Sequence, residues 1–227
     1  MSAIREMLNR DKLIYFPLLL LFLIASCNNV VKTDKENNSI IKNTPEEIEE
    51  AKANLTSEKK IDMFTFSAIY KPWDYIIAME NKGKIGKAEL EKKKEEINDL
   101  QYYTFKIKYN EDKIEMLMAG LSSKEEYYAR IQYFSFAMQN DLKLIDGEDT
   151  LDCALFHFER TYGLASEATF SLGFPLTKQE QEQKRDNPEV MNNSKTLIYD
   201  DKALGVGKVY VKIDQKKLNN IPEIKTQ

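Results

Sequence analysis

The chain has 227 residues, of which 42% are hydrophobic, 31% charged and 11% aromatic, and its formal net charge is −4 at pH 7. This length suits one domain with a substantial core, and the mild acidity argues against a nucleic-acid partner. The many Tyr and Phe residues argue against intrinsic disorder and favour β-structure.

A short apolar run lies near the start of the chain, at residues 13–24. As a helix it would extend about 18 Å, against about 30 Å of hydrocarbon in a bilayer, so it is too short to span a membrane. Arg5, Arg10 and Lys12 precede the run and small residues follow it. This arrangement is typical of a secretory signal.

The end of the run is more specific. The sequence Ile24-Ala25-Ser26-Cys27 resembles the lipobox of bacterial lipoproteins. The resemblance covers residues 1–27, and it implies cleavage between Ser26 and Cys27, a diacylglyceryl thioether on Cys27 and acylation of the new amino terminus. Two or more acyl chains anchor a protein stably to a bilayer. An ordinary signal peptide, or a buried N-terminal helix that contains a cysteine, is the alternative.

Three segments are therefore predicted: a cleaved signal peptide over residues 1–26, a lipidated tether over 27–43 and a single globular domain over 44–227. The tether is polar and aperiodic, with a reach of roughly 20–25 Å. By resemblance to enterobacterial sorting, Asn28 favours the outer membrane of a Gram-negative cell, while the side of the membrane that the domain faces stays open. Because Cys27 carries lipid, Cys153 has no disulfide partner within the chain.

Helix signals come first in the domain. Thr44 and Glu47 have the spacing of a capping box, which predicts the start of a helix. In residues 60–70 the pattern changes to a period of two, as in a strand. The elements predicted in this half are, in chain order, a helix over 44–55, a strand over 60–70, helices over 72–83 and 87–100, a strand over 102–109 and a helical turn at 115–120.

Strand signals dominate the remainder. Asp146-Gly147 between apolar runs is a hairpin signal, and Thr177 with Glu180 suits the cap of a short exposed helix in a polar segment, 178–195. The predicted strands cover 131–138, 142–145, 150–160, 167–175, 196–200 and 208–214. This order favours an α+β fold, an antiparallel sheet or β-sandwich with helices concentrated in the N-terminal half.

Cys153, His157 and Glu159 are the most reactive residues that lie close together in the sequence. A cysteine nucleophile needs its base within about 2.6–3.2 Å, but residues i and i+4 of a strand lie about 13 Å apart. We therefore predict no catalytic group here. The two faces of the predicted strand are Ala154, Phe156 and Phe158 on one side, and Cys153, Leu155, His157 and Glu159 on the other.

Three residues remain as possible binding residues: His157 with Glu159, and Trp73, whose aromatic neighbours also suit a core. The carboxylates of residues 146–152 lack the spacing of an EF-hand, and a solvated hairpin turn explains them. The sequence holds no phosphate loop, zinc motif or nucleophile elbow. No metal and no cofactor are therefore expected, and the polar segment 178–195 is either disordered, a loose surface helix or a partner-binding loop.

These observations predict a membrane-anchored, non-enzymatic envelope lipoprotein. Its partners would be the lipid bilayer, through acylated Cys27, and a protein or glycan that the domain binds alone or as an accessory subunit. A carboxylate-dependent cell-surface hydrolase is the first alternative, because the spatial pairing of acidic residues cannot be seen in a sequence. A periplasmic immunity-type protein is the second.

Overall fold

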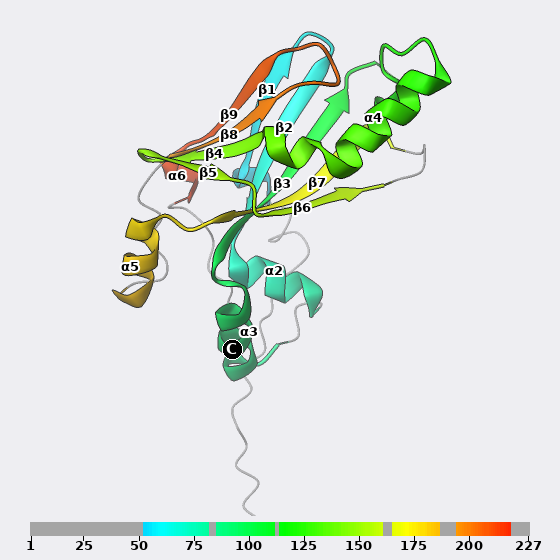
Figure 1. Ribbon diagram of the computed structural model, residues 1–227. Helices are drawn as coiled ribbons and strands as arrows, with labels where there is room; N and C mark the ends of the chain where they lie inside the picture. Colours follow the sequence, from blue (N-terminus) through cyan, green and yellow to red (C-terminus); the bar gives the residue numbers. More distant parts are fainter. Residues whose placement is uncertain (1–51, 82–84, 112–113, 161–164, 187–193, 219–227) are drawn as a thin grey trace, which may run out of the picture. The chain divides into compact units, whose positions relative to one another are not determined.

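The computed structural model describes residues 52–81, 85–111, 114–160, 165–186 and 194–218. They form two sheets in which every strand pair is antiparallel (Figure 1), so the fold is α+β with two antiparallel sheets, as predicted. The first sheet contains, in spatial order, β1 (Thr56–Ile61), β2 (Phe64–Lys71), β3 (Leu100–Tyr109), β7 (Glu167–Pro175) and β6 (Leu155–Glu159). The second contains β5 (Asp149–Asp152), β4 (Leu142–Asp146), β8 (Lys195–Asp200) and β9 (Lys208–Ile213).

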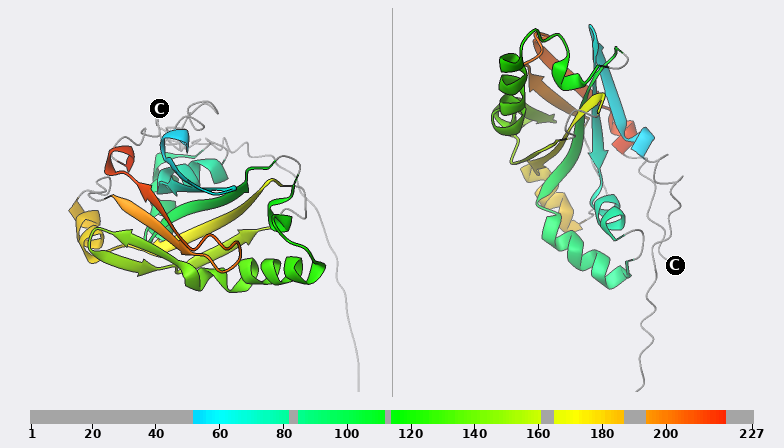
Figure 2. Two further views of the ribbon diagram at one scale, coloured as in Figure 1. Left: turned by 90° about the horizontal axis from the view of Figure 1, so that it is seen from above. Right: turned by 90° about the vertical axis from the view of Figure 1, so that its right-hand side faces the viewer.

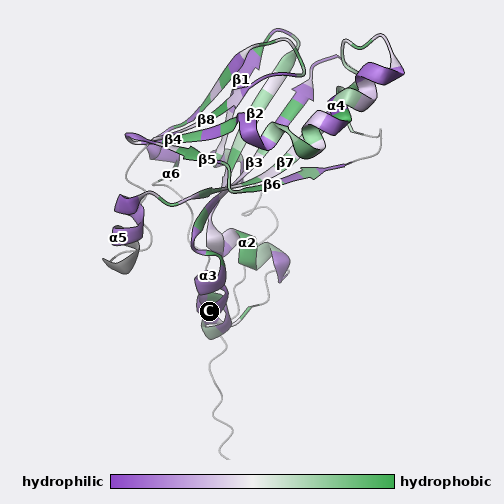
Figure 3. Cartoon of the chain, viewed as in Figure 1, coloured by the Kyte–Doolittle hydropathy of each residue, from purple (hydrophilic) through white to green (hydrophobic). Residues whose placement is uncertain are grey.

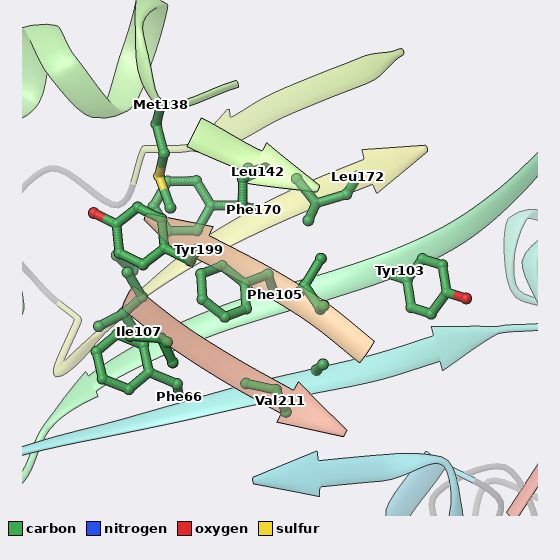
Figure 4. Packing of buried hydrophobic residues seen from close by; sticks show 14 of the residues in the cluster. Phe66, Tyr103, Phe105, Ile107, Met138, Leu142, Phe170, Leu172, Tyr199 and Val211 are labelled. Atoms are coloured by element: carbon green, nitrogen blue, oxygen red, sulfur yellow. The ribbon is translucent and has the colours of Figure 1, made fainter. Parts of the chain in front are cut away.

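Alternating apolar residues of both sheets build one hydrophobic core. In β3, which confirms the strand predicted over 102–109, Tyr103, Phe105 and Ile107 are buried. Phe105 meets Tyr199 of the second sheet with ring centroids 5.8 Å apart, and Figure 4 shows these side chains pointing toward one another. Edge-on ring contacts of this kind add to the stabilisation from burial.

The chain passes from one sheet to the other three times: from β3 to β4, from β5 to β6 through residues 153 and 154, and from β7 to β8. In addition, β9 lies against β1 and β2. Helix α6 (Gln215–Leu218) follows β9, and its Lys217 donates to the carbonyl of Thr56 at 2.5 Å. The two sheets are therefore joined at both margins.

Helices flank the sheets. Helices α2 (Trp73–Glu80) and α3 (Lys87–Ile97), both predicted, pack on each other through a small cluster of their own that includes Ile77 and Leu90. The 3-10 turn η1 (Met116–Met118), helix α4 (Lys124–Phe136), the 3-10 turn η2 (Met138–Asp141) and helix α5 (Lys178–Asp186) follow. Described helices lie on both sides of the chain's middle, so their concentration in the N-terminal half stays a prediction.

The predicted strand over 131–138 is wrong, because these residues belong to α4 and η2. A complete capping box begins the helix: Ser123 Oγ accepts the Glu126 N–H at 3.2 Å, and Glu126 Oε2 accepts the Ser123 N–H at 3.2 Å. Arg130 and Phe134, one helical turn apart, are the buried residues of α4. Tertiary packing and the cap thus outweigh the local alternation.

The strand predicted over 60–70 is right only for its second part. A hairpin turn at Asp62 and Met63 separates β1 from β2, and Asp62 adopts a left-handed φ of 51°. The turn lacks the Asn-Gly or Asp-Gly pair that usually marks a hairpin. The predicted signal peptide, Ser26, Cys27, the tether and most of the predicted helix over 44–55 lie outside the described residues.

Candidate functional site

Trp73 lies at the junction of α2 and the first sheet. Its indole Nε1 donates to the carbonyl of Leu100 at 2.8 Å, and the side chain is only partly exposed. A buried indole N–H normally requires such a partner. Trp73 therefore joins α2 to the start of β3, which gives it a structural role where a binding role was predicted as possible.

His157 and Glu159 lie on the outer face of β6, the edge strand of the first sheet. Both are exposed, whereas Phe158 is buried and Phe156 partly buried, which confirms the predicted faces for this part of the strand. Glu159 Oε1 accepts the hydroxyl of Ser171 at 3.0 Å. The structure thus keeps this pair at the surface, two strands away from the β3 backbone that holds Trp73.

Cys153 does not join this face. It lies in the link between β5 and β6, buried, and its thiol contacts the carbonyl of Leu155 at 3.1 Å. Because the strand is interrupted here, Cys153 departs from the face on which it was predicted. Burial raises the pKa of the Cys153 thiol to about 11. A buried thiol of this kind is a poor nucleophile near neutral pH.

Sequence reasoning missed a buried charged group where the two sheets meet α5, which we call the Lys195 cluster: Gln101, Tyr103, Asp146, Glu180 and Lys195. Asp146 ends β4 and Lys195 begins β8, and the two residues are directly opposite in the sheet. Lys195 Nζ forms ion pairs with Asp146 Oδ2 and Glu180 Oε1. The side chains of Lys195 and Asp146 are 0% exposed and that of Glu180 is 11% exposed.

Side chains of β3 complete the Lys195 cluster. Gln101 Nε2 donates to Asp146 Oδ2 at 3.1 Å and to the carbonyl of Pro175 at 3.1 Å, and it lies 3.5 Å from Glu180 Oε2. The hydroxyl of Tyr103 donates to Gln101 Oε1 at 2.7 Å. Four strands of the two sheets, β3, β4, β7 and β8, and helix α5 are thereby linked through one ammonium group and one amide.

The electrostatics of the Lys195 cluster are unbalanced. Two carboxylates surround one ammonium group, and Asp146 Oδ1 is buried with no hydrogen-bond partner among the residues that the structure describes. Burial raises the pKa of Glu180, although Lys195 opposes that rise. Burial also raises the pKa of Tyr103, and the neighbouring Tyr70 adds to that rise. The phenol of Tyr103 therefore stays protonated.

The structure confirms the predicted cap of α5. It does not show the polar segment 178–195 exposed throughout, because Glu180 and Lys195 belong to the buried cluster. Thr177 Oγ1 accepts the Glu180 N–H at 3.2 Å and Glu180 Oε2 accepts the Thr177 N–H at 3.1 Å. Residues 187–193 of the same segment lie outside the described residues. No local pattern marked Lys195, because its ionic partners are 49 and 15 positions away in the sequence.

The predicted hairpin at Asp146-Gly147 is confirmed as β4–β5, with Gly147 at φ 61°. Asp146, however, is buried rather than solvated. Asp152 faces solvent and pairs with Lys143. Among the described residues, no group of three or more His, Cys, Asp and Glu side chains is arranged to hold a metal ion.

Helix α4 is held firmly to the core. The guanidinium of Arg130 donates to the carbonyls of Leu117 at 3.1 Å, Ala119 at 2.7 Å and Ala203 at 3.0 Å. Phe134 packs edge-on against Phe170 with centroids 5.3 Å apart. Arg130 and Phe134 thus fix both the position and the rotation of the helix.

The opposite side of α4 carries large exposed side chains, which we call the α4 aromatic face: Tyr128, Gln132 and Phe136. Tyr128 is 65% exposed and Phe136 is 81% exposed. Residues spaced by four lie on one side of a helix. Figures 1 and 2 place α4 at the periphery of the sheets, at the end away from α5. Figure 3 shows mixed hydropathy on α4, in contrast with the hydrophilic α3.

Comparisons with models of protein families, with curated proteins and with solved structures find no match to this chain. Within the described ranges, no helix is both long enough and apolar enough to cross a membrane.

Proposed function

We propose that the protein is a membrane-anchored envelope lipoprotein, held at the outer membrane by acylated Cys27, whose domain binds a protein partner through the α4 aromatic face. The observation that carries this proposal is the exposure of Tyr128 and Phe136 on a helix whose other side is fixed by Arg130. Aromatic residues dominate the energetics of protein interfaces when a partner covers them.

The geometry of the α4 aromatic face favours a protein over a glycan. Anchors at i, i+4 and i+8 of a rigid helix match the way in which an amphipathic helix enters an apolar groove. Because α4 is already ordered, its partner would not have to offset the entropy of folding it. The exposed pair His157 and Glu159 on the edge strand β6 is the alternative surface for a glycan, and it offers no exposed aromatic ring of its own.

The alternative of a carboxylate-dependent hydrolase finds less support. Asp146 and Glu180 are brought together, but both are ion-paired with Lys195, and Asp146 is buried. A glycosidase needs one carboxylic acid and one free carboxylate on either side of an accessible bond. A periplasmic immunity-type protein remains a variant of the binding proposal, in which the partner is a toxin.

Affinity capture of the full chain from detergent-solubilised membranes of the native host tests the proposal. We expect a defined protein to co-purify with the wild type and to be lost with the double variant Tyr128→Ser and Phe136→Ser. The matched control is Met79→Ser, which removes another exposed apolar side chain, 58% exposed, from α2. The proposal is contradicted if the double variant captures the protein partner as well as Met79→Ser does. It is also contradicted if no protein partner is captured and a glycan or peptide is turned over.

A further inference from the structure

Three of the four edge strands of the two sheets are protected against pairing with another chain. β1 carries Lys59 and Lys60, both exposed, and it lies against β9. β9 itself carries Lys208 and Lys212. β5 is only four residues long and has an aspartate at each end. Lysine side chains, short strands and cover by a neighbouring element are the usual means by which a sheet avoids the addition of a foreign strand.

The fourth edge strand, β6, has no lysine and no proline among its residues, Leu155–Glu159. It pairs with β7 only, so within the described ranges no strand lies along its other side. Figure 1 shows β6 at the margin of the first sheet. The backbone N–H and C=O groups on that side of β6 are therefore available for pairing with a further strand.

The side chains of β6 favour an added strand as well. On the inner face, Phe158 stacks on Phe170 of β7 with ring centroids 5.0 Å apart. Phe156 packs against the same ring at 5.9 Å but is only partly buried, so the aromatic row of the core reaches the edge of the sheet and is incomplete there. On the outer face, Leu155 is 40% exposed. A strand placed beside β6 would cover apolar surface on both faces.

We propose that the strand added to β6 is the β6 of a second copy of the chain, paired antiparallel about a twofold axis at His157. The sequence of β6 is complementary to itself in this register. With His157 opposite His157 of the second copy, Phe156 faces Phe158 of the second copy, and every residue of the strand is paired. Aromatic residues directly opposite one another are favourable cross-strand pairs. A shift by one residue would oppose inner and outer faces, and a larger shift would leave part of β6 unpaired.

The pairing joins the first sheets of two copies into one continuous sheet. A twofold axis perpendicular to the sheet keeps the inner faces of both copies on the same side, so the aromatic rows of the two cores meet at the axis. A contact of this symmetry is closed, because each β6 has one free side and the second copy occupies it. Association therefore ends at the dimer. The dimer goes beyond the function proposed above, since it forms without the partner of the α4 aromatic face.

Cysteine cross-linking of the full chain in membranes tests the position of the axis. Directly opposite residues of an antiparallel pair have Cα atoms about 4.5–5.5 Å apart, a separation that suits a disulfide. His157→Cys should therefore form a disulfide with its own copy under mild oxidation, and peptide mapping should locate the link at residue 157. The matched control is Glu159→Cys, at another exposed position of β6. It should not cross-link, because the two copies of residue 159 lie about 13 Å apart in this register.

The mass of the purified full chain in detergent, measured by light scattering, tests the dimer itself. We expect the wild type to have twice the mass of one chain. His157→Lys places two ammonium groups at the axis and should give the monomer, with the stability of the wild type in urea because His157 is exposed. Tyr210→Lys, at a half-exposed position of the edge strand β9, should remain dimeric. The proposal is overturned if the wild type is monomeric, if His157→Lys stays dimeric, or if Glu159→Cys cross-links as readily as His157→Cys.

Discussion

Removing the ammonium group of the Lys195 cluster should strongly destabilise the fold. Lys195→Met keeps most of the side-chain volume but leaves Asp146 and Glu180 facing one another with Gln101 as their shared side-chain donor. Breaking a buried ion pair by deleting one partner costs about 3–5 kcal/mol. For a domain of this size, each kcal/mol shifts the melting temperature by about 2–4 °C, which gives a decrease of roughly 6–20 °C.

Urea unfolding followed by the fluorescence of Trp73, the single tryptophan, measures this loss on the chain from residue 27 onward with Cys27→Ser. Adding Asp146→Asn and Glu180→Gln to Lys195→Met removes the two carboxylate charges that have lost their ammonium partner. The triple variant should therefore regain most of the lost free energy of unfolding. A Lys195→Met variant whose free energy of unfolding lies within about 1 kcal/mol of wild type would show that the Lys195 ion pairs do not stabilise the fold. A triple variant no more stable than Lys195→Met would show that the unpaired carboxylates are not the cause of the loss.

Two other predictions concern α4 and the free thiol. Arg130→Met leaves three carbonyls without the donor that the guanidinium provides, so the free energy of unfolding measured in urea should fall by about 3 kcal/mol or more. A decrease below about 1 kcal/mol contradicts this role of Arg130. Cys153 should react very slowly with a thiol reagent at pH 8 in the folded protein, since a pKa of about 11 leaves about one thiolate in a thousand. Rapid labelling without denaturant, measured by mass spectrometry, would show that the thiol is accessible.

Strands with strict alternation could be predicted from the sequence, because one face of each packs on the core. β3 and β7 are of this kind, and their inward residues are the buried ones. The strand predicted over 131–138 failed, because these residues belong to α4 and η2. The stronger signal was Ser123 with Glu126, whose reciprocal hydrogen bonds begin the helix seven residues earlier than the alternation.

The candidate sites were harder to predict than the fold. The Lys195 cluster assembles from β3, β4, β8 and α5, so its charges meet only after both sheets have formed. A lysine in a polar segment is normally solvated, and nothing near Lys195 in the sequence indicates otherwise. The α4 aromatic face was hidden for a different reason: the predicted strand began at residue 131, so Tyr128 lay outside it and no helix connected Tyr128 with Phe136.

We propose that acylated Cys27 holds this domain at a membrane, where α4 meets its partner. Intact-mass measurement of the protein extracted from the membranes of its native host is the decisive test of this anchoring. We expect residues 1–26 to be absent and the mass of the remaining chain to be increased by a diacylglyceryl group, with or without a further acyl chain, located on residue 27. A chain that retains residues 1–26, or that carries an unmodified Cys27, would contradict it.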